Sequence, residues 1–247
     1  MAIIGIYTLS EQMQARGSNK WTAPAFITSN LNLWYDFNNS SSYPGSGTTI
    51  TDLSGNSNTG TLSATTTYTS SPGRLTFANA SQITTTTSFA NPQTFTVGVW
   101  FRTSSASGRK ICGFENPQTG TTLTSYDRHF WVGSTGLLKW GVYSGTANIY
   151  NTTLTVTDNT WREAVCSYSG NVSSIYVNGA LSGTISGAAE NYTGWWRVAG
   201  YGAQSWETGF TNGYWTGDIG MFYVYSTALN ATQISSNFEA NRARFGL

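Results

Sequence analysis

The feature that most constrains the fold of this chain is a series of short strand-like runs, each bounded by residues that favour turns. The run TFTVGVWFRT (94–103) alternates apolar and other residues with a period of two, which is typical of a strand with one buried face. Between two later runs lies Asn178-Gly179, the dipeptide that most strongly favours a two-residue hairpin turn. The strand-like runs cover residues 31–37, 74–78, 94–103, 109–114, 129–133, 138–144, 161–168, 173–179, 195–200 and 218–225.

One segment near the C-terminus has the pattern of a helix. In TALNATQISSNFEANRARFG, Leu229, Ile234 and Phe238 recur at roughly helical spacing, and Asn230 or Thr232 is placed to cap the helix start. Strands do not alternate with helices anywhere in the chain, which argues against a parallel sheet. The pattern predicts an all-β fold, a sandwich of two antiparallel sheets with a short C-terminal helix, rather than two domains.

The composition excludes several classes of protein. Only 9% of the residues are charged and the net charge is +1, so no electrostatic attraction to nucleic acid or to an anionic membrane is expected. No apolar run is long enough to cross a membrane, and the first residues lack the basic segment of a signal peptide. Cys112 and Cys166 lie inside apolar strand-like runs, which predicts two buried free thiols rather than a disulfide.

The acidic residues give no local signature of an enzyme. Retaining glycosidases need two carboxyl groups about 5 Å apart, whereas no two of the 11 acids here fall within four positions of each other. His129 is the only histidine, and no serine lies in a G-x-S-x-G motif, so a Ser–His–Asp triad is not indicated. We therefore expect no enzyme. A glycosidase that uses distant acids, Glu115 with Asp127 or Glu207, is the less favoured alternative.

Residues 190–215 concentrate aromatic side chains between amides and carboxylates, which is the composition of a carbohydrate site. Strand alternation sends Trp196 to one face and Trp195 to the other, so some of these rings must lie outside the core. Packing against a partner subunit is the open alternative for the outward rings. The candidate sugar-binding residues are Trp195, Tyr201, Trp206, Glu207, Asn212 and Trp215, with Trp195, Trp206 and Trp215 as the stacking residues.

The tract SSYPGSGTTITDLSGNSNTGTL (41–62) is almost wholly polar and allows two interpretations. Asp52, Asn56 and Asn58, with Ser54 between them, offer oxygen ligands that Ca²⁺ accepts, although a single carboxylate predicts weak affinity. The favoured interpretation is that these side chains close local turns on their own backbone. The tract then forms the long connection that opens a β-sandwich.

Residues 1–28 fit no strand pattern and are expected to form an N-terminal arm, followed by one domain over residues 29–247. The arm either packs on another subunit or docks locally. In the first case, deletion of residues 1–28 should leave a folded domain that no longer assembles.

Four blocks of sequence resemble laminin-G-like, concanavalin A-like jelly-roll domains. They are LNLWYDF with the DLSGNSNTG loop, FTVGVWFRT, NTWREAVCSYSGNVSSIYVNGALSG, and YWTGDIGMFYVYSTALNATQI with the ending NFEANRARFGL, which together span residues 30–247. The resemblance implies a concanavalin A-like jelly roll. The catalytic Glu-x-Asp-x-x-Glu strand of the related glucanases has no counterpart, and Gly220 stands where many members carry an aspartate.

The opening SSYPGSGTT with DLSGN, and the ending NFEANRARFGL, are similar to versions found in virion proteins of tailed bacteriophages. This resemblance implies a non-catalytic virion protein on the capsid or tail surface, a decoration or fibre protein assembled in the host cytoplasm. It would contact other virion proteins through residues 1–28, form a homo-oligomer and bind host surface glycans. A free extracellular lectin-like module is the alternative.

Overall fold

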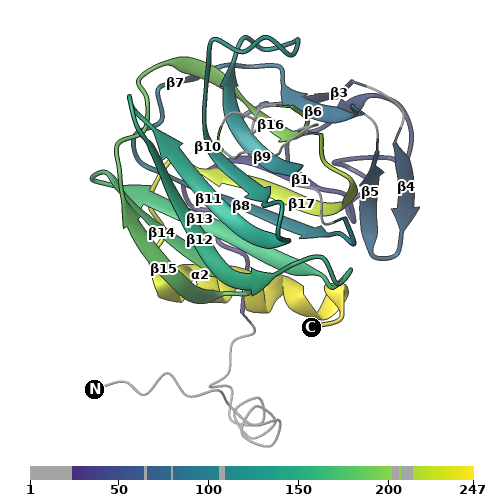
Figure 1. Cartoon of the computed structure of the whole chain (residues 1–247). Helices are drawn as coiled ribbons and strands as arrows, with labels where there is room; N and C mark the ends of the chain where they lie inside the picture. The colour runs from purple at the N-terminus through teal and green to yellow at the C-terminus, as the bar shows by residue number, and fades with distance from the viewer. Residues whose placement is uncertain (1–23, 64–65, 79, 106–108, 202–205, 207–213) are drawn as a thin grey trace, which may run out of the picture.

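A computed structural model describes residues 24–63, 66–78, 80–105, 109–201, 206 and 214–247. Two sheets, one of 8 strands and one of 9, pack face to face, and every strand pair is antiparallel. Figure 1 shows the two layers, with a helix near the C-terminus lying against one of them. The predicted antiparallel sandwich with one short C-terminal helix is confirmed.

The 8-stranded sheet has the strand order β15-β14-β13-β8-β17-β5-β4, and β1 also pairs with β17. Its neighbouring central strands β8 and β17 lie far apart in the sequence, so this sheet joins the middle of the chain to its C-terminal part. Its strands are β1 Leu31–Asp36, β4 Thr67–Ser70, β5 Gly73–Phe77, β8 Phe95–Arg102, β13 Arg162–Ser169, β14 Val172–Val177, β15 Ala180–Ser186 and β17 Gly217–Tyr225.

The 9-stranded sheet has the order β12-β11-β10-β9-β16-β6-β3-β2, and β7 pairs with β16. Its strands are β2 Thr49–Ile50, β3 Gly60–Leu62, β6 Gln82–Thr85, β7 Phe89–Ala90, β9 Arg109–Asn116, β10 Ser125–Val132, β11 Leu137–Tyr143, β12 Ala147–Thr155 and β16 Thr193–Ala199.

The main core lies between the sheets and follows the period-two pattern of the sequence. Phe95 of β8 packs against Trp140 and Trp196 from the facing sheet, with ring centroids 6.4 and 5.8 Å apart. Trp196 is buried in this core while its neighbour Trp195 is partly exposed on the other face, which confirms the predicted alternation. Cys112 and Cys166 are buried here as free thiols, also as predicted.

The hairpin turn between β14 and β15 also follows from the sequence. Asn178 and Gly179 have φ angles of 50° and 75°. Two successive residues with positive φ are the requirement of a type I′ turn, whose twist matches the twist of the two strands.

A second core lies on the outer face of the 8-stranded sheet, beneath α2 (Ala231–Asn241) and the short 3-10 helix η2 (Arg242–Phe245). The indole of Trp100 stacks on Phe238 and Phe245, with centroids 5.6 and 4.3 Å apart. Asn230, not Thr232, caps α2, through a reciprocal pair of hydrogen bonds with Gln233. No helix in the described part of the chain is long and apolar enough to span a membrane.

The chain before β1 docks on this second core. Phe26 contacts the rings of Trp34 and Tyr223, with centroids 5.0 and 5.3 Å apart, and the backbone N–H of Ile27 donates to Oδ1 of Asn237 over 2.8 Å. Phe26 and Ile27, which the expected boundary assigns to the arm, therefore pack on the domain. Residues 1–23 of the expected arm lie outside the described residues.

Candidate functional site

The outer face of the 9-stranded sheet carries two rows of side chains that run across neighbouring strands. In the first row, Trp195 of β16 pairs with Glu115 of β9, which pairs with Tyr126 of β10. The second row places Arg197 of β16 opposite Gly113 of β9. Aromatic and charged side chains therefore lie together on the face of the sheet that points away from the main core.

Two glycines in the strands let aromatic rings lie directly on the sheet. A Cβ atom at Gly113 would come within 2.0 Å of the His129 ring, and one at Gly141 within 2.3 Å of the Trp206 indole. Glycine inside a strand commonly marks such a close approach. Trp206 lies against His129, Trp131 and Tyr143, with ring centroids 5.4, 5.9 and 6.2 Å apart.

A pocket of about 430 Å³ opens beside Trp206. It combines three aromatic rings with two aliphatic hydroxyls and one carboxylate, a mixture suited to the apolar faces and hydroxyls of a sugar. Its described lining residues are Thr124, Ser125, Tyr126, Tyr143, Ala147, Glu190 and Trp206.

A buried charged cluster lies under the same face, centred on Glu115. The carboxylate of Glu115 forms ion pairs with Lys110 and, over 3.1 Å, with Nε of Arg197, and lies 3.5 Å from Nε2 of His129. Burial alone would raise the pKa of Glu115, but Lys110, His129 and Arg197 together lower it to about 2. Burial lowers the pKa of His129 to about 4, so the imidazole is neutral at physiological pH.

The cations of this cluster also donate hydrogen bonds to backbone carbonyls of loops. Lys110 donates to the carbonyl of Tyr201, and Arg197 donates to the carbonyls of Gly120 and Pro117 over 3.1 and 2.5 Å. Both side chains are fully buried. The cluster therefore fastens the loops after β9 and β16 to the sheet, and neither cation lines the pocket.

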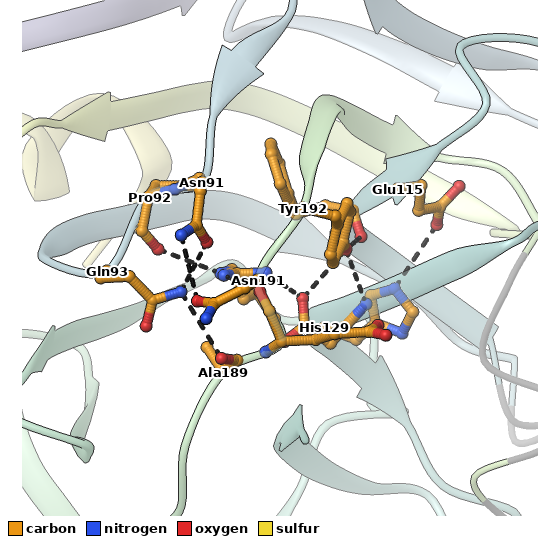
Figure 2. A network of polar contacts seen from close by, with 12 residues as sticks. Asn91, Pro92, Gln93, Glu115, His129, Ala189, Asn191 and Tyr192 are labelled. Carbon is orange, nitrogen blue, oxygen red and sulfur yellow. Dashed lines mark hydrogen bonds and ion pairs between the residues drawn. The ribbon is translucent and has the colours of Figure 1, made fainter. Parts of the chain in front are cut away.

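A second buried network surrounds Tyr192 and Asp127. Figure 2 shows Tyr192 among these hydrogen bonds, together with the contact between Glu115 and His129. The Tyr192 hydroxyl donates to the carbonyl of Phe114 over 2.6 Å and lies 3.0 Å from Oδ1 of Asp127. Asp127 also forms an ion pair with Arg128. Burial raises the pKa of Asp127, although Arg128 and these hydrogen bonds oppose the shift.

The structure separates the predicted sugar-binding residues. Trp206 lines the pocket, whereas Trp195 and Tyr201 are partly exposed outside it, and the Tyr201 ring lies 5.5 Å from that of Tyr214. The prediction for Trp215 is wrong: it is 1% exposed and packs in the main core against Phe101. Glu207 and Asn212 lie outside the described residues.

Tyr126, Tyr143 and Glu190 line the pocket but were not predicted as site residues. The glycines inside two strand-like runs, in KICGF and LKWGVY, indicate that a ring approaches the backbone, but the rings that do so are those of His129 and Trp206. They therefore point to this face of the sheet and not to Tyr126, Tyr143 or Glu190 individually.

The polar tract 41–62 closes on itself through Asp52. Its carboxylate accepts hydrogen bonds from the backbone N–H groups of Trp34, Ser54 and Asn58, each over 2.9 Å, and from the Ser54 hydroxyl. Asn56 and Asn58 donate their side-chain amides to the carbonyls of Leu31 and Asn32 (2.9 and 2.7 Å). The favoured turn-closing interpretation is confirmed for Asp52, whose carboxylate oxygens are taken up by these bonds. Calcium binding by Asp52, Asn56 and Asn58 stays a prediction. Within the described residues, no group of three or more His, Cys, Asp or Glu side chains is placed to hold a metal.

Comparison with known proteins identifies the fold. The model of one family, described as the concanavalin A-like lectin/glucanases superfamily, matches residues 76–235. A search of curated proteins finds no match. Among solved structures, botulinum neurotoxin type C, from a study of its dependence on two ganglioside molecules, has a TM-score of 0.63 and 14% identity, covering 87% of this chain and 52% of that chain.

Two further structures are similar. Domain 4 of the arabinanase AbnA from Geobacillus stearothermophilus, in complex with arabinotriose, has a TM-score of 0.57 and 13% identity, over 84% of this chain and 98% of that domain. Trypanosoma rangeli sialidase in complex with sialic acid has a TM-score of 0.64 and 11% identity, over 90% of this chain and 35% of that chain. This chain spans about half the length of the toxin chains. At such identities the likeness shows the shared fold.

Proposed function

The chain belongs to the concanavalin A-like lectin/glucanases superfamily, and on this premise we propose that it is a non-catalytic carbohydrate-binding domain. The observation that carries the proposal is the pocket in which Tyr126, Tyr143 and Trp206 meet two hydroxyls and one carboxylate. The rings would stack on the apolar face of a sugar while the polar groups bond its hydroxyls. The arabinotriose complex of AbnA domain 4, which this chain matches over 98% of that domain's length, supports a sugar as the ligand class.

The state of the buried acids supports a role without catalysis. A general acid in a glycosidase must hold a proton near neutral pH, whereas the Glu115 carboxylate is ionised beside Lys110 and Arg197. Asp127 forms an ion pair with Arg128 and accepts a hydrogen bond from the Tyr192 hydroxyl. Both side chains are fully buried, so neither reaches a sugar in the pocket.

The test compares two tryptophans on the same face of the sheet. Trp206→Ala should lower glycan affinity about tenfold or more, since it removes the largest stacking surface of the pocket. Trp195→Ala is the matched control, because this partly exposed indole does not line the pocket. Affinity is measured by calorimetry on the best ligand from a glycan array, with thermal melting to confirm that both variants fold. Equal losses in the two variants would contradict the proposal, and release of reducing sugar from the bound glycan would contradict the absence of catalysis.

The assembly to which the domain belongs is the subject of a separate proposal. The resemblance of the opening tract and of the ending NFEANRARFGL to tailed-phage versions supports a virion protein on the capsid or tail surface. Residues 1–28 would then contact other virion proteins, and the pocket would meet host glycans. A free extracellular lectin remains the competing proposal.

A further inference from the structure

Glu190 gives the pocket its charge. Of the described residues that line the pocket, it alone carries a charged side chain, and no described residue forms an ion pair with its carboxylate. The cation that contacts the backbone of Glu190, Arg128, is fully buried and forms its ion pair with Asp127. The cations of the Glu115 cluster, Lys110 and Arg197, are also fully buried and are held by Glu115 and by loop carbonyls.

A buried ion pair fixes the backbone of Glu190 from both sides. Oδ2 of Asp127 accepts a hydrogen bond from the Glu190 N–H over 3.0 Å, and Nη2 of Arg128 donates to the Glu190 carbonyl over 2.8 Å. Asp127 and Arg128 form an ion pair with each other, and both side chains are fully buried. Such a clamp holds Glu190 at the pocket wall independently of any ligand.

The clamp depends on an irregularity in β10. Asp127 pairs with Phe114 while Phe130 pairs with Cys112, so β10 has one extra residue between these pairs. Arg128 takes up the extra residue with φ of 55°, a conformation that is rare for long side chains. Its guanidinium donates to the Pro92 carbonyl and lies over the rings of Phe114 and Tyr192, 5.0 and 5.3 Å from their centroids. Strained residues persist where their surroundings fix them, commonly at functional sites.

We propose that Glu190 determines the specificity of this pocket, so that it takes neutral, hydroxyl-rich sugars and excludes sugars that carry a carboxylate, such as sialic acid and uronic acids. This inference rests on the proposed carbohydrate-binding function. An ionised carboxylate accepts strong, charge-assisted hydrogen bonds from sugar hydroxyls. A carboxylate on the ligand would face the like charge of Glu190, and no cation among the described lining residues would offset that repulsion.

Glu190 would give this chain a different ligand choice from structural neighbours of the same fold. The sialidase structure holds sialic acid, and the toxin study concerns gangliosides. A shared sandwich does not transfer ligand choice, because the ligand is selected by the few side chains at the site.

The experiment uses a glycan array that carries neutral oligosaccharides beside the same glycans bearing a terminal sialic acid. The full chain should bind the neutral member of each recognised pair at least about tenfold more tightly. Glu190→Gln, which keeps the size of the side chain, should lower neutral affinity about tenfold and bring the two members of a pair within about threefold. Glu239→Gln, an exposed change on α2, is the matched charge control and should alter neither quantity.

The outcomes separate this inference from the proposed function. A full chain that prefers sialylated glycans, or a Glu190→Gln variant with unchanged discrimination, overturns the role of Glu190 while Trp206-dependent binding still stands. A full chain that binds no glycan on the array overturns the proposed function, and the inference falls with it. Thermal melting of Glu190→Gln within about 2 °C of the parent excludes unfolding as the cause.

Discussion

Single residues decide whether the rings of the pocket can reach the sheet, and Gly141 is the clearest case. The Trp206 indole occupies the space in which any other residue at position 141 would place its Cβ atom. The strand could accept a larger residue, but the ring could not remain where it lies. Glycine at position 141 is therefore required by the position of the Trp206 ring and not by the strand itself.

Gly141→Ala should displace Trp206 and lower glycan affinity about tenfold, while the melting temperature changes little because the ring is partly exposed. In a Trp206→Ala background the same change should have almost no further effect on affinity, since the displaced ring is already absent. Affinities of the two single variants and the double variant test this coupling. Additive losses would show that Gly141 acts by another route.

At the scale of elements, the packing of α2 on the 8-stranded sheet encloses an acid that has no cation beside it among the described residues. Glu163 of β13 is fully buried and accepts a hydrogen bond from the Tyr223 hydroxyl over 2.8 Å. Burial raises the pKa of Glu163 from 4.5 to about 8, although its hydrogen bonds oppose the shift. The folded protein therefore keeps a proton on Glu163 at pH values where the unfolded chain has lost it.

This proton makes stability depend on pH with a definite sign. Between pH 4.5 and about 8 the native state binds more protons at Glu163 than the unfolded state, so the contribution of this residue to the free energy of unfolding falls as pH rises. In Glu163→Gln this contribution should vanish, and above about pH 8 the variant should be more stable than the parent by a few kcal/mol. Urea unfolding of both proteins from pH 5 to 9 measures the difference. A constant difference over this range would contradict the proton assignment.

The sequence predicts elements better than it predicts the site, and two tryptophans show why. Trp195 and Trp196 lie within β16, where the period of two assigns one to each face. Trp215 precedes β17, so no strand period applies to it, and its burial against Phe101 depends on tertiary packing. Tyr126 and Glu190 meet at the pocket from distant positions in the chain, a contact that no local pattern encodes.

At the scale of the whole molecule, the docked residues before β1 decide which truncations fold. A chain that starts at residue 24 should melt like the full chain, because it retains the packing of Phe26 and the hydrogen bonds of Ile27 to Asn237 and Tyr225. A chain that starts at residue 29 loses these contacts and should be less stable by about 2–4 kcal/mol. The expectation that deletion of residues 1–28 leaves a folded domain stays a prediction, which the chain that starts at residue 29 tests.

Thermal melting and light scattering of the three chains test this prediction together with the role of the arm. A defined oligomer of the full chain that becomes monomeric from residue 24 onwards would support assembly through the N-terminal residues. Equal melting of the chains that start at residues 24 and 29 would contradict the docking of Phe26.

The docked segment and the pocket lie on opposite outer faces of the sandwich. Ala25 to Ile27 lie beside α2 on the 8-stranded sheet, whereas Trp206 lies on the 9-stranded sheet. If the chain were attached to a larger assembly through the residues before Ala25, the pocket would therefore face away from that assembly. Many copies attached to one assembly would present their pockets outward together. Sugar contacts that are weak one by one would then combine into avidity without any additional interface.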